Sequence, residues 1–158
     1  ANGTQDLILS LDRLEAARAL PLLKLTGTML SNNDFTMPLH CATKDTQKSE
    51  LEGRITKMLE LDTRVRCLDA SSIAAKAGNP KAANMALCGA ASRAVPLPAE
   101  SLIQAICAEI APRHAESSLK AYFGGMAGQA TSRAEAVQPA ACPFVMVEAT
   151  AALKEQVA

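Results

Sequence analysis

The chain has 158 residues, which suffices for one domain with a substantial hydrophobic core. It carries 16 basic and 16 acidic residues, and only 3% of its residues are aromatic. This balance argues against nucleic-acid binding, and so few aromatic side chains argue against stacking platforms for bases. No apolar run is long enough to span a membrane and the first residues lack a signal-peptide pattern, so we expect no signal peptide and no membrane partner.

The first third of the chain predicts a strand, a helix and a second strand. A short apolar run at residues 7–11 is typical of a buried parallel strand. Asp12 is suited to cap a helix over residues 13–23, and residues 28–30 predict the next strand. The polar segment at residues 32–47 is predicted to be a surface loop.

Helix and strand patterns continue to alternate in the middle of the chain. Apolar residues at helical spacing predict a helix over residues 48–61, followed by a strand at Val65–Leu68 and a helix over residues 71–77. Such alternation is typical of βαβ units. We therefore predict an α/β fold of three layers, with a mainly parallel sheet, flanking helices and a helical C-terminal part.

The helical C-terminal part rests on two apolar stripes after the break at Pro96 and Pro98. The first stripe comprises Leu102, Ile103, Ile106, Cys107 and Ile110, and the second Leu119, Tyr122, Phe123, Met126 and Ala130. Residues 134–158 form a tail whose role stays open between an arm that docks on a partner and a segment that completes the core.

Residue patterns that would mark a complete catalytic or metal site are missing from the sequence. The five cysteines are odd in number and widely spaced, so we expect no disulfide framework and no iron–sulfur signature. His40 and the adjacent Cys41 provide only two possible metal ligands, so we assign no metal site there. We assign no catalytic role to His114. The catalytic residues are unknown at this stage.

The stretch at residues 78–90 carries the clearest local signals. Gly78 suits the end of one helix, Asn79 can cap the next, and Pro80 fits its first position. We expect Gly89 to be buried on this helix, together with Ala86, because small side chains let another backbone approach. The candidate cofactor-binding residues are the polar ones in this stretch: Asn79, Lys81 and Asn84. Lys81 is either a solvated surface lysine or a residue that meets a phosphate at the helix N-terminus, and we expect Asn84 to make a buried hydrogen bond or an interface contact.

The same stretch resembles a known family. Gly-Asn-Pro-Lys-Ala-Ala-Asn-Met at residues 78–85, followed by Leu-Cys-Gly-Ala at 87–90, is similar to the γ subunit or γ domain of 2-oxoacid:ferredoxin oxidoreductases. The resemblance is strongest to the variety found as the β subunit of indolepyruvate oxidoreductase. Segments at residues 6–24, 97–102 and 119–125 agree with the family in the same order.

The resemblance implies a subunit or domain of a cytoplasmic complex that oxidatively decarboxylates a 2-oxoacid of the indolepyruvate or pyruvate type. Such a complex forms an acyl-coenzyme A and reduces ferredoxin, with thiamine diphosphate, iron–sulfur clusters and coenzyme A as its cofactors. These cofactors are expected in the complex and none is expected on this chain alone. The chain would shape the site and the interface with other subunits, and would be inactive in isolation.

One feature of the family has no counterpart before Asp6: an opening strand with a Gly-Gly-Gln-Gly loop and a helix. The glycine-rich residues 124–129 follow a helix and do not replace it. We therefore expect residues 1–158 to form a single, incomplete γ-type domain. Two alternatives stay open: a non-enzymatic flavodoxin-like or regulatory α/β binding module, and a structural fragment that has lost its ligand loop.

Overall fold

A computed structural model describes residues 2–37 and 45–128 of the chain. The first half contains β1 (Gln5–Ser10), α1 (Arg13–Ala19), the 3-10 turn η1 (Leu20–Leu22), β2 (Leu23–Asn32), α2 (Asp45–Leu61) and β3 (Val65–Leu68). The second half is helical and contains α3 (Ala70–Lys76), the 3-10 turn η3 (Pro80–Ala82), α4 (Ala83–Ala91), α5 (Ala99–Glu109) and α6 (Pro112–Gly128). No helix in these residues is long and apolar enough to cross a membrane.

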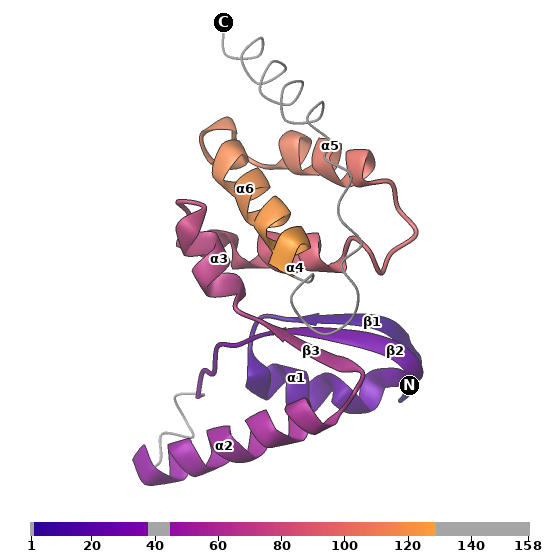
Figure 1. Ribbon diagram of the computed structural model, residues 1–158, viewed down its shortest axis with the longest axis vertical. Helices are drawn as coiled ribbons and strands as arrows, with labels where there is room; N and C mark the ends of the chain where they lie inside the picture. The colour runs from indigo at the N-terminus through magenta and orange to yellow at the C-terminus, as the bar shows by residue number, and fades with distance from the viewer. Residues whose placement is uncertain (1, 38–44, 129–158) are drawn as a thin grey trace, which may run out of the picture.

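The three strands form a parallel sheet in the order β1-β2-β3. Helices α1 and α2 cover one face, whereas α3, α4 and α6 lie on the opposite side (Figure 1). This arrangement follows from the βαβ connections, which carry the helices α1 and α2 across the same face of the sheet. The predicted three-layer α/β fold, its parallel sheet and its helical C-terminal part are therefore confirmed.

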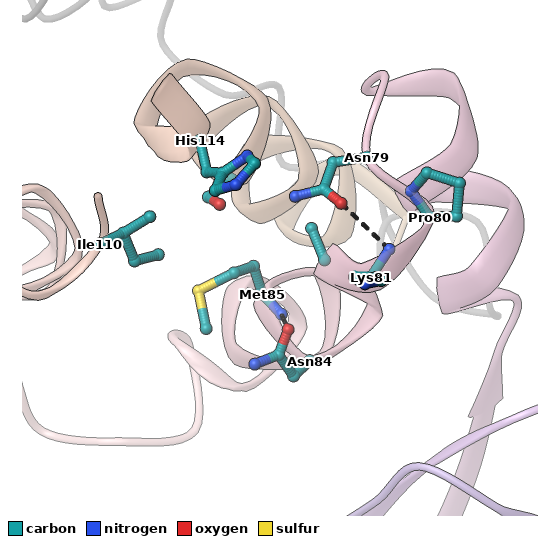
Figure 2. Close-up of a pocket in the computed structure, with 9 residues that line it drawn as sticks. Asn79, Pro80, Lys81, Asn84, Met85, Ile110 and His114 are labelled. Atoms are coloured by element: carbon teal, nitrogen blue, oxygen red, sulfur yellow. Dashed lines mark hydrogen bonds between the residues drawn. The ribbon is translucent and has the colours of Figure 1, made fainter. Parts of the chain in front are cut away.

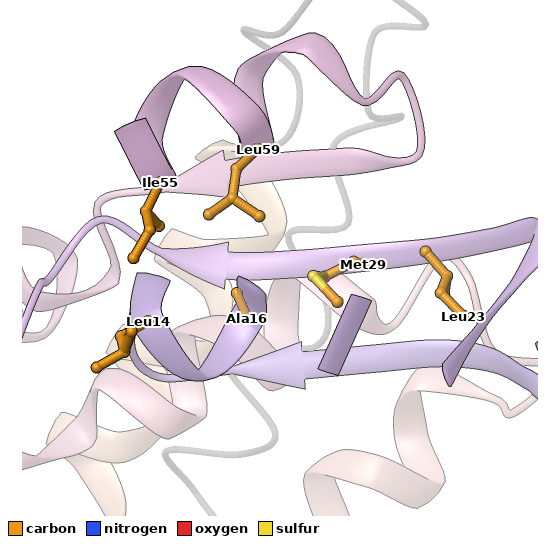
Figure 3. Close-up of a cluster of buried hydrophobic side chains, with 6 residues drawn as sticks. All are labelled: Leu14, Ala16, Leu23, Met29, Ile55 and Leu59. Carbon is orange, nitrogen blue, oxygen red and sulfur yellow. The ribbon is translucent and has the colours of Figure 1, made fainter. Parts of the chain in front are cut away.

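Neighbouring residues of β2 enter two different cores. Met29 is fully buried against α1 and α2, and Leu30 is buried against α3 and α4. This division follows from the alternation of side chains across a strand. Figure 3 shows the first core, whose buried members are Leu14, Ala16, Leu23, Met29, Ile55 and Leu59. The second core contains Leu30, Ala70, Ala86, Leu87, Ala90 and Ala91.

Helices α4 and α6 cross in very close contact at two glycines. A Cβ atom added at Gly89 would collide with the carbonyl oxygen of Tyr122 and lie 2.7 Å from its carbonyl carbon. A Cβ atom at Gly125 would likewise collide with the carbonyl oxygen of Ala86. The expected burial of Ala86 and Gly89 is confirmed, and these small residues set the separation of the two helices.

The boundaries of α1 and β2 differ from those predicted. Helix α1 ends at Ala19 and gives way to the η1 turn, because Pro21 lacks the N–H that a longer helix would need. Strand β2 is far longer than residues 28–30. It contains buried Gly27, whose missing Cβ leaves room for the backbone of Gln5, and it ends in polar residues that are nevertheless buried.

The loop predicted at residues 32–47 is shorter than expected, since β2 includes Asn32 and α2 begins at Asp45. His40 and Cys41 lie outside the described residues, as does the tail at 134–158. Both C-terminal helices form, but they are buried to different degrees. Helix α6 buries Leu119 and Tyr122, whereas no residue of α5 is fully buried, so the first apolar stripe is only partly covered in the described part of the chain.

Candidate functional site

The connection between α3 and η3 places Asn79 at the edge of a surface cavity. Gly78 adopts a positive φ of 86°, the left-handed conformation that ends α3 and favours glycine. Asn79 then becomes extended, and its Oδ1 accepts a hydrogen bond of 3.1 Å from the Lys81 backbone N–H. The predicted cap is thus confirmed, but it caps the short η3 turn, and the α-helix proper begins only at Ala83.

The geometry around Lys81 corrects one part of the prediction. One of the two interpretations of Lys81 was that free backbone amides at a helix N-terminus attract a phosphate beside it. The Lys81 N–H is instead bonded to the Asn79 side chain, and the Ala82 N–H donates to the Asn79 carbonyl over 2.9 Å. These amides are therefore satisfied within η3, and what Lys81 can offer a ligand is its exposed side chain.

Asn84 lies on the exposed side of α4. Its Oδ1 accepts a hydrogen bond of 3.0 Å from the adjacent Met85 N–H. The expected buried hydrogen bond is therefore wrong, because the start of α4 turns this position outward. The other part of the expectation, a contact with a partner, stays a prediction.

The three predicted residues meet at one cavity of about 520 Å³. The cavity is formed by η3, the first turn of α4 and the corner where α5 passes into α6 (Figure 2). Its complete lining consists of Asn79, Pro80, Lys81, Ala82, Asn84, Met85, Ile110, His114 and Ser118. Sequence reasoning missed Ser118 and gave His114 no role, because both come from a helix some thirty residues away that only the fold brings alongside.

A second, more polar hollow adjoins this cavity and shares Asn79 and His114 with it. There, Lys120 Nζ lies 2.7 Å from Glu116 Oε1, and this hydrogen bond lowers the pKa of the Glu116 carboxyl. Arg113 Nε donates a hydrogen bond of 3.1 Å to Nε2 of the neighbouring His114. The carboxylate is thus already paired with Lys120, while Arg113 and Lys81 form no ion pair within the described residues.

Polar groups at the carboxyl edge of the sheet form a separate cluster, in which the side chains hydrogen-bond to one another and to nearby backbone groups. Asn32 is 1% exposed, and its Oδ1 accepts from the Ala70 N–H at 2.9 Å. Its Nδ2 donates to the Leu11 carbonyl and to Ser71 Oγ, whose hydroxyl in turn donates to Asp34. Because these polar groups are hydrogen-bonded to one another, the cluster stabilises the segments of the chain that follow the three strands.

The cysteines of the described residues are separate from one another. Cys67, Cys88 and Cys107 are free, and burial raises the pKa of the Cys67 and Cys88 thiols. No three His, Cys, Asp or Glu side chains within residues 2–37 and 45–128 are grouped as metal ligands would be.

Replacing Asn79 by Ala should lower the free energy of unfolding by about 1 kcal/mol, because the Lys81 N–H loses its cap. Asn84→Ala is the matched control, since alanine is the better helix former at an exposed position of α4. We expect the control to be neutral or slightly stabilising. Denaturant melts of both variants provide the measurement, and equal losses in the two would contradict the assigned cap.

The fold and the motif around this cavity agree with one family of enzymes. The chain belongs to the pyruvate ferredoxin/flavodoxin oxidoreductase family, whose sequence model matches residues 1–128. The chain is also 30% identical over 133 residues to the indolepyruvate oxidoreductase subunit IorB of Methanothermobacter thermautotrophicus. That match covers 83% of this chain and 68% of the relative. The resemblance seen in the sequence is confirmed, and the chain is a component of an oxidoreductase of this family.

Proposed function

We propose that this chain is the γ-type component of a 2-oxoacid:ferredoxin oxidoreductase and works only together with other subunits in the cytoplasm. The complex would oxidatively decarboxylate a 2-oxoacid of the indolepyruvate or pyruvate type, form an acyl-coenzyme A and pass electrons to ferredoxin. The observation that carries this proposal is the family match, which extends over all the described residues and includes the cavity-forming motif. The relative is likewise named as a subunit.

Within that complex, Asn79, Lys81 and Asn84 would contact a cofactor. Support for this role is that all three line the same cavity although Asn79 precedes η3, Lys81 lies in η3 and Asn84 lies in α4. The lining offers nitrogen and hydroxyl groups and no thiolate or carboxylate, a donor set that suits coenzyme A better than an iron–sulfur cluster. Coenzyme A supplies the thiol that receives the acyl group. We assign thiamine diphosphate and the clusters to partner subunits.

The purified chain alone should not reduce an electron acceptor when 2-oxoacid, coenzyme A, thiamine diphosphate and the acceptor are supplied. The described residues contain no group of side chains that could hold a redox metal, so electrons have no evident carrier on them. Acceptor absorbance over time is the measurement, with pyruvate and indolepyruvate tested separately. The same mixture with the assembled complex serves as the positive control. Turnover by the chain alone would overturn the proposed division of labour.

A further inference from the structure

We propose that a groove between α3 and α6 is a docking site for an acidic, extended segment of a partner subunit. This α3–α6 groove consists of two adjoining hollows, the polar one described above, of about 330 Å³, and a second of about 320 Å³. The second hollow is lined by Ile73, Lys76, Ala77, Lys120 and Gly124. Apart from Asn79 and His114, the lining of the groove lies outside the candidate cofactor cavity. Only the assignment of the segment to a partner subunit rests on the proposed function.

The groove follows one face of α6. The lining residues that α6 contributes include Arg113, Glu116, Ser117, Lys120 and Gly124. They recur at intervals of three or four positions, which is the spacing of a single helix face. From Arg113 to Gly124 the helix rises about 16 Å, and an extended chain covers that distance with about five residues. The opposite wall is the end of α3, which lies beside α6 (Figure 1).

Basic side chains line both hollows. Arg113 and Lys120 line the first, and Lys76 and Lys120 the second. All three are exposed, and neither Lys76 nor Arg113 forms an ion pair within the described residues. The one carboxylate in the lining, that of Glu116, lies 2.7 Å from Lys120 Nζ. Exposed pairs of this kind contribute little to stability, so Lys120 remains available to a competing carboxylate.

The sequence around the groove has the same bias toward positive charge. Residues 70–98, which include α3, η3 and α4, contain Lys76, Lys81 and Arg93 and no acidic residue. The whole chain has zero net charge, so this segment is more basic than the rest of the chain. A local excess of positive charge steers an acidic partner toward this side of the molecule and selects against basic ones.

The second hollow adds an apolar contact to the groove. It is lined by Gly124, which has no side chain to fill it, and by Ile73, which is only partly buried. The two residues are close, because a Cβ atom added at Gly124 would lie 2.7 Å from Ile73 Cγ2. An apolar side chain of the partner can cover Ile73 here while neighbouring carboxylates meet Lys76 and Lys120. The segment that fits therefore carries an apolar residue next to several acidic ones.

A polypeptide fits this groove better than a nucleic acid does. No aromatic side chain lines either hollow, so bases would have no surface on which to stack. Three basic side chains match the carboxylates of a few consecutive acidic residues, whereas binding to a nucleic acid relies on a broader basic surface. The source of the segment is assigned to a partner subunit because the similar protein is itself named as a subunit.

The probe is a fluorescently labelled peptide, Leu-Glu-Asp-Glu-Asp-Glu, whose length and composition match the groove. Titration with the 158-residue chain, followed by fluorescence anisotropy, should give a Kd on the order of 0.1–1 mM at low salt. Added salt should weaken this binding several-fold. The uncharged peptide Leu-Gln-Asn-Gln-Asn-Gln should not bind measurably. A thymidine hexanucleotide that bound as tightly as the acidic peptide would overturn the assignment to a polypeptide.

Lys76→Glu should weaken binding of the acidic peptide by about tenfold, because repulsion replaces attraction beside the bound carboxylates. Lys57→Glu is the matched control, since Lys57 is also exposed but lies on α2, across the sheet. Glu116→Gln should tighten binding several-fold by releasing Lys120, and Glu60→Gln on α2 is its control. Thermal melts verify that each variant is folded. Equal weakening by the two lysine variants, or equal binding of the acidic and uncharged peptides, would overturn the groove.

Carbodiimide cross-linking of the assembled complex tests the source of the segment, because this reagent joins a lysine amine directly to a carboxylate in contact with it. Mass spectrometry should find Lys76 coupled to an Asp or Glu in an acidic segment of a partner subunit. Coupling of Lys76 only to carboxylates of this chain, or no coupling at Lys76, would overturn the assignment to a partner. The peptide titration uses the isolated chain, so its result is independent of the assembly tested in the Discussion.

Discussion

Gly89→Ala should destabilise the chain by about 3 kcal/mol, the upper end of the usual cost of overpacking. The added methyl group would overlap the carbonyl group of Tyr122, and backbone cannot move aside as the tip of a flexible side chain can. The helices α4 and α6 would have to separate, opening the contact that buries Ala86 and Tyr122. The midpoint of urea or thermal unfolding measures the effect.

Gly53→Ala is the control for this prediction, because it makes the same change in another helix. Gly53 is exposed in α2, and a Cβ atom there would meet no atom within 4 Å. Alanine should therefore stabilise the helix by about 0.5–1 kcal/mol. Gly125→Ala should behave like Gly89→Ala, since its methyl group would overlap Ala86. We therefore expect Gly89→Ala and Gly125→Ala to lower the free energy of unfolding and Gly53→Ala to raise it. A neutral Gly89→Ala would contradict the close crossing of α4 and α6.

The second large effect is expected at Asn32, where replacement by Ala should cost about 3 kcal/mol. The change would leave the buried Ala70 N–H without its acceptor and the Leu11 carbonyl without its donor. It would also release Ser71, so the segments that leave β1, β2 and β3 would lose their common partner. Equilibrium unfolding in urea is the measurement.

Asn33→Ala separates this effect from a general loss of asparagine at the end of β2. Asn33 is only partly buried, and its side chain makes no hydrogen bond among the described residues. We expect a change within about 0.5 kcal/mol for this variant. If Asn32→Ala were equally mild, the hydrogen bonds around its amide would not be holding the edge of the sheet together.

The sequence predicted well those features of the fold that depend only on residues adjacent in the chain. The caps at Asp12 and Asn79 depend on a few adjacent residues, and both form. The length of β2 depends on tertiary contacts instead. Its polar Ser31 and Asn32 are buried because residues from other segments satisfy or cover them, and no local pattern reveals that.

The residues of the candidate site also fall into two groups: those that the sequence indicates and those that only the fold brings to the cavity. Asn79, Lys81 and Asn84 could be selected from the sequence because they stand in one motif. His114 and Ser118 join them only because α6 crosses α4 at Gly89 and Gly125, which brings the start of α6 beside η3. The free-amide site that was one interpretation of Lys81 does not form, because a 3-10 turn precedes α4 and uses those amides internally.

This chain is a component of an oxidoreductase of the pyruvate ferredoxin/flavodoxin oxidoreductase family, and we propose that its partner subunits carry thiamine diphosphate and iron–sulfur clusters. The most direct test of this proposal is purification of the tagged chain from its native host, with mass spectrometry of the proteins that accompany it and assays for thiamine diphosphate and iron. We predict stoichiometric partner subunits that carry both cofactors, and 2-oxoacid-dependent reduction of ferredoxin by the purified material. Recovery of the chain without such partners, free of both cofactors and without activity, would contradict the account.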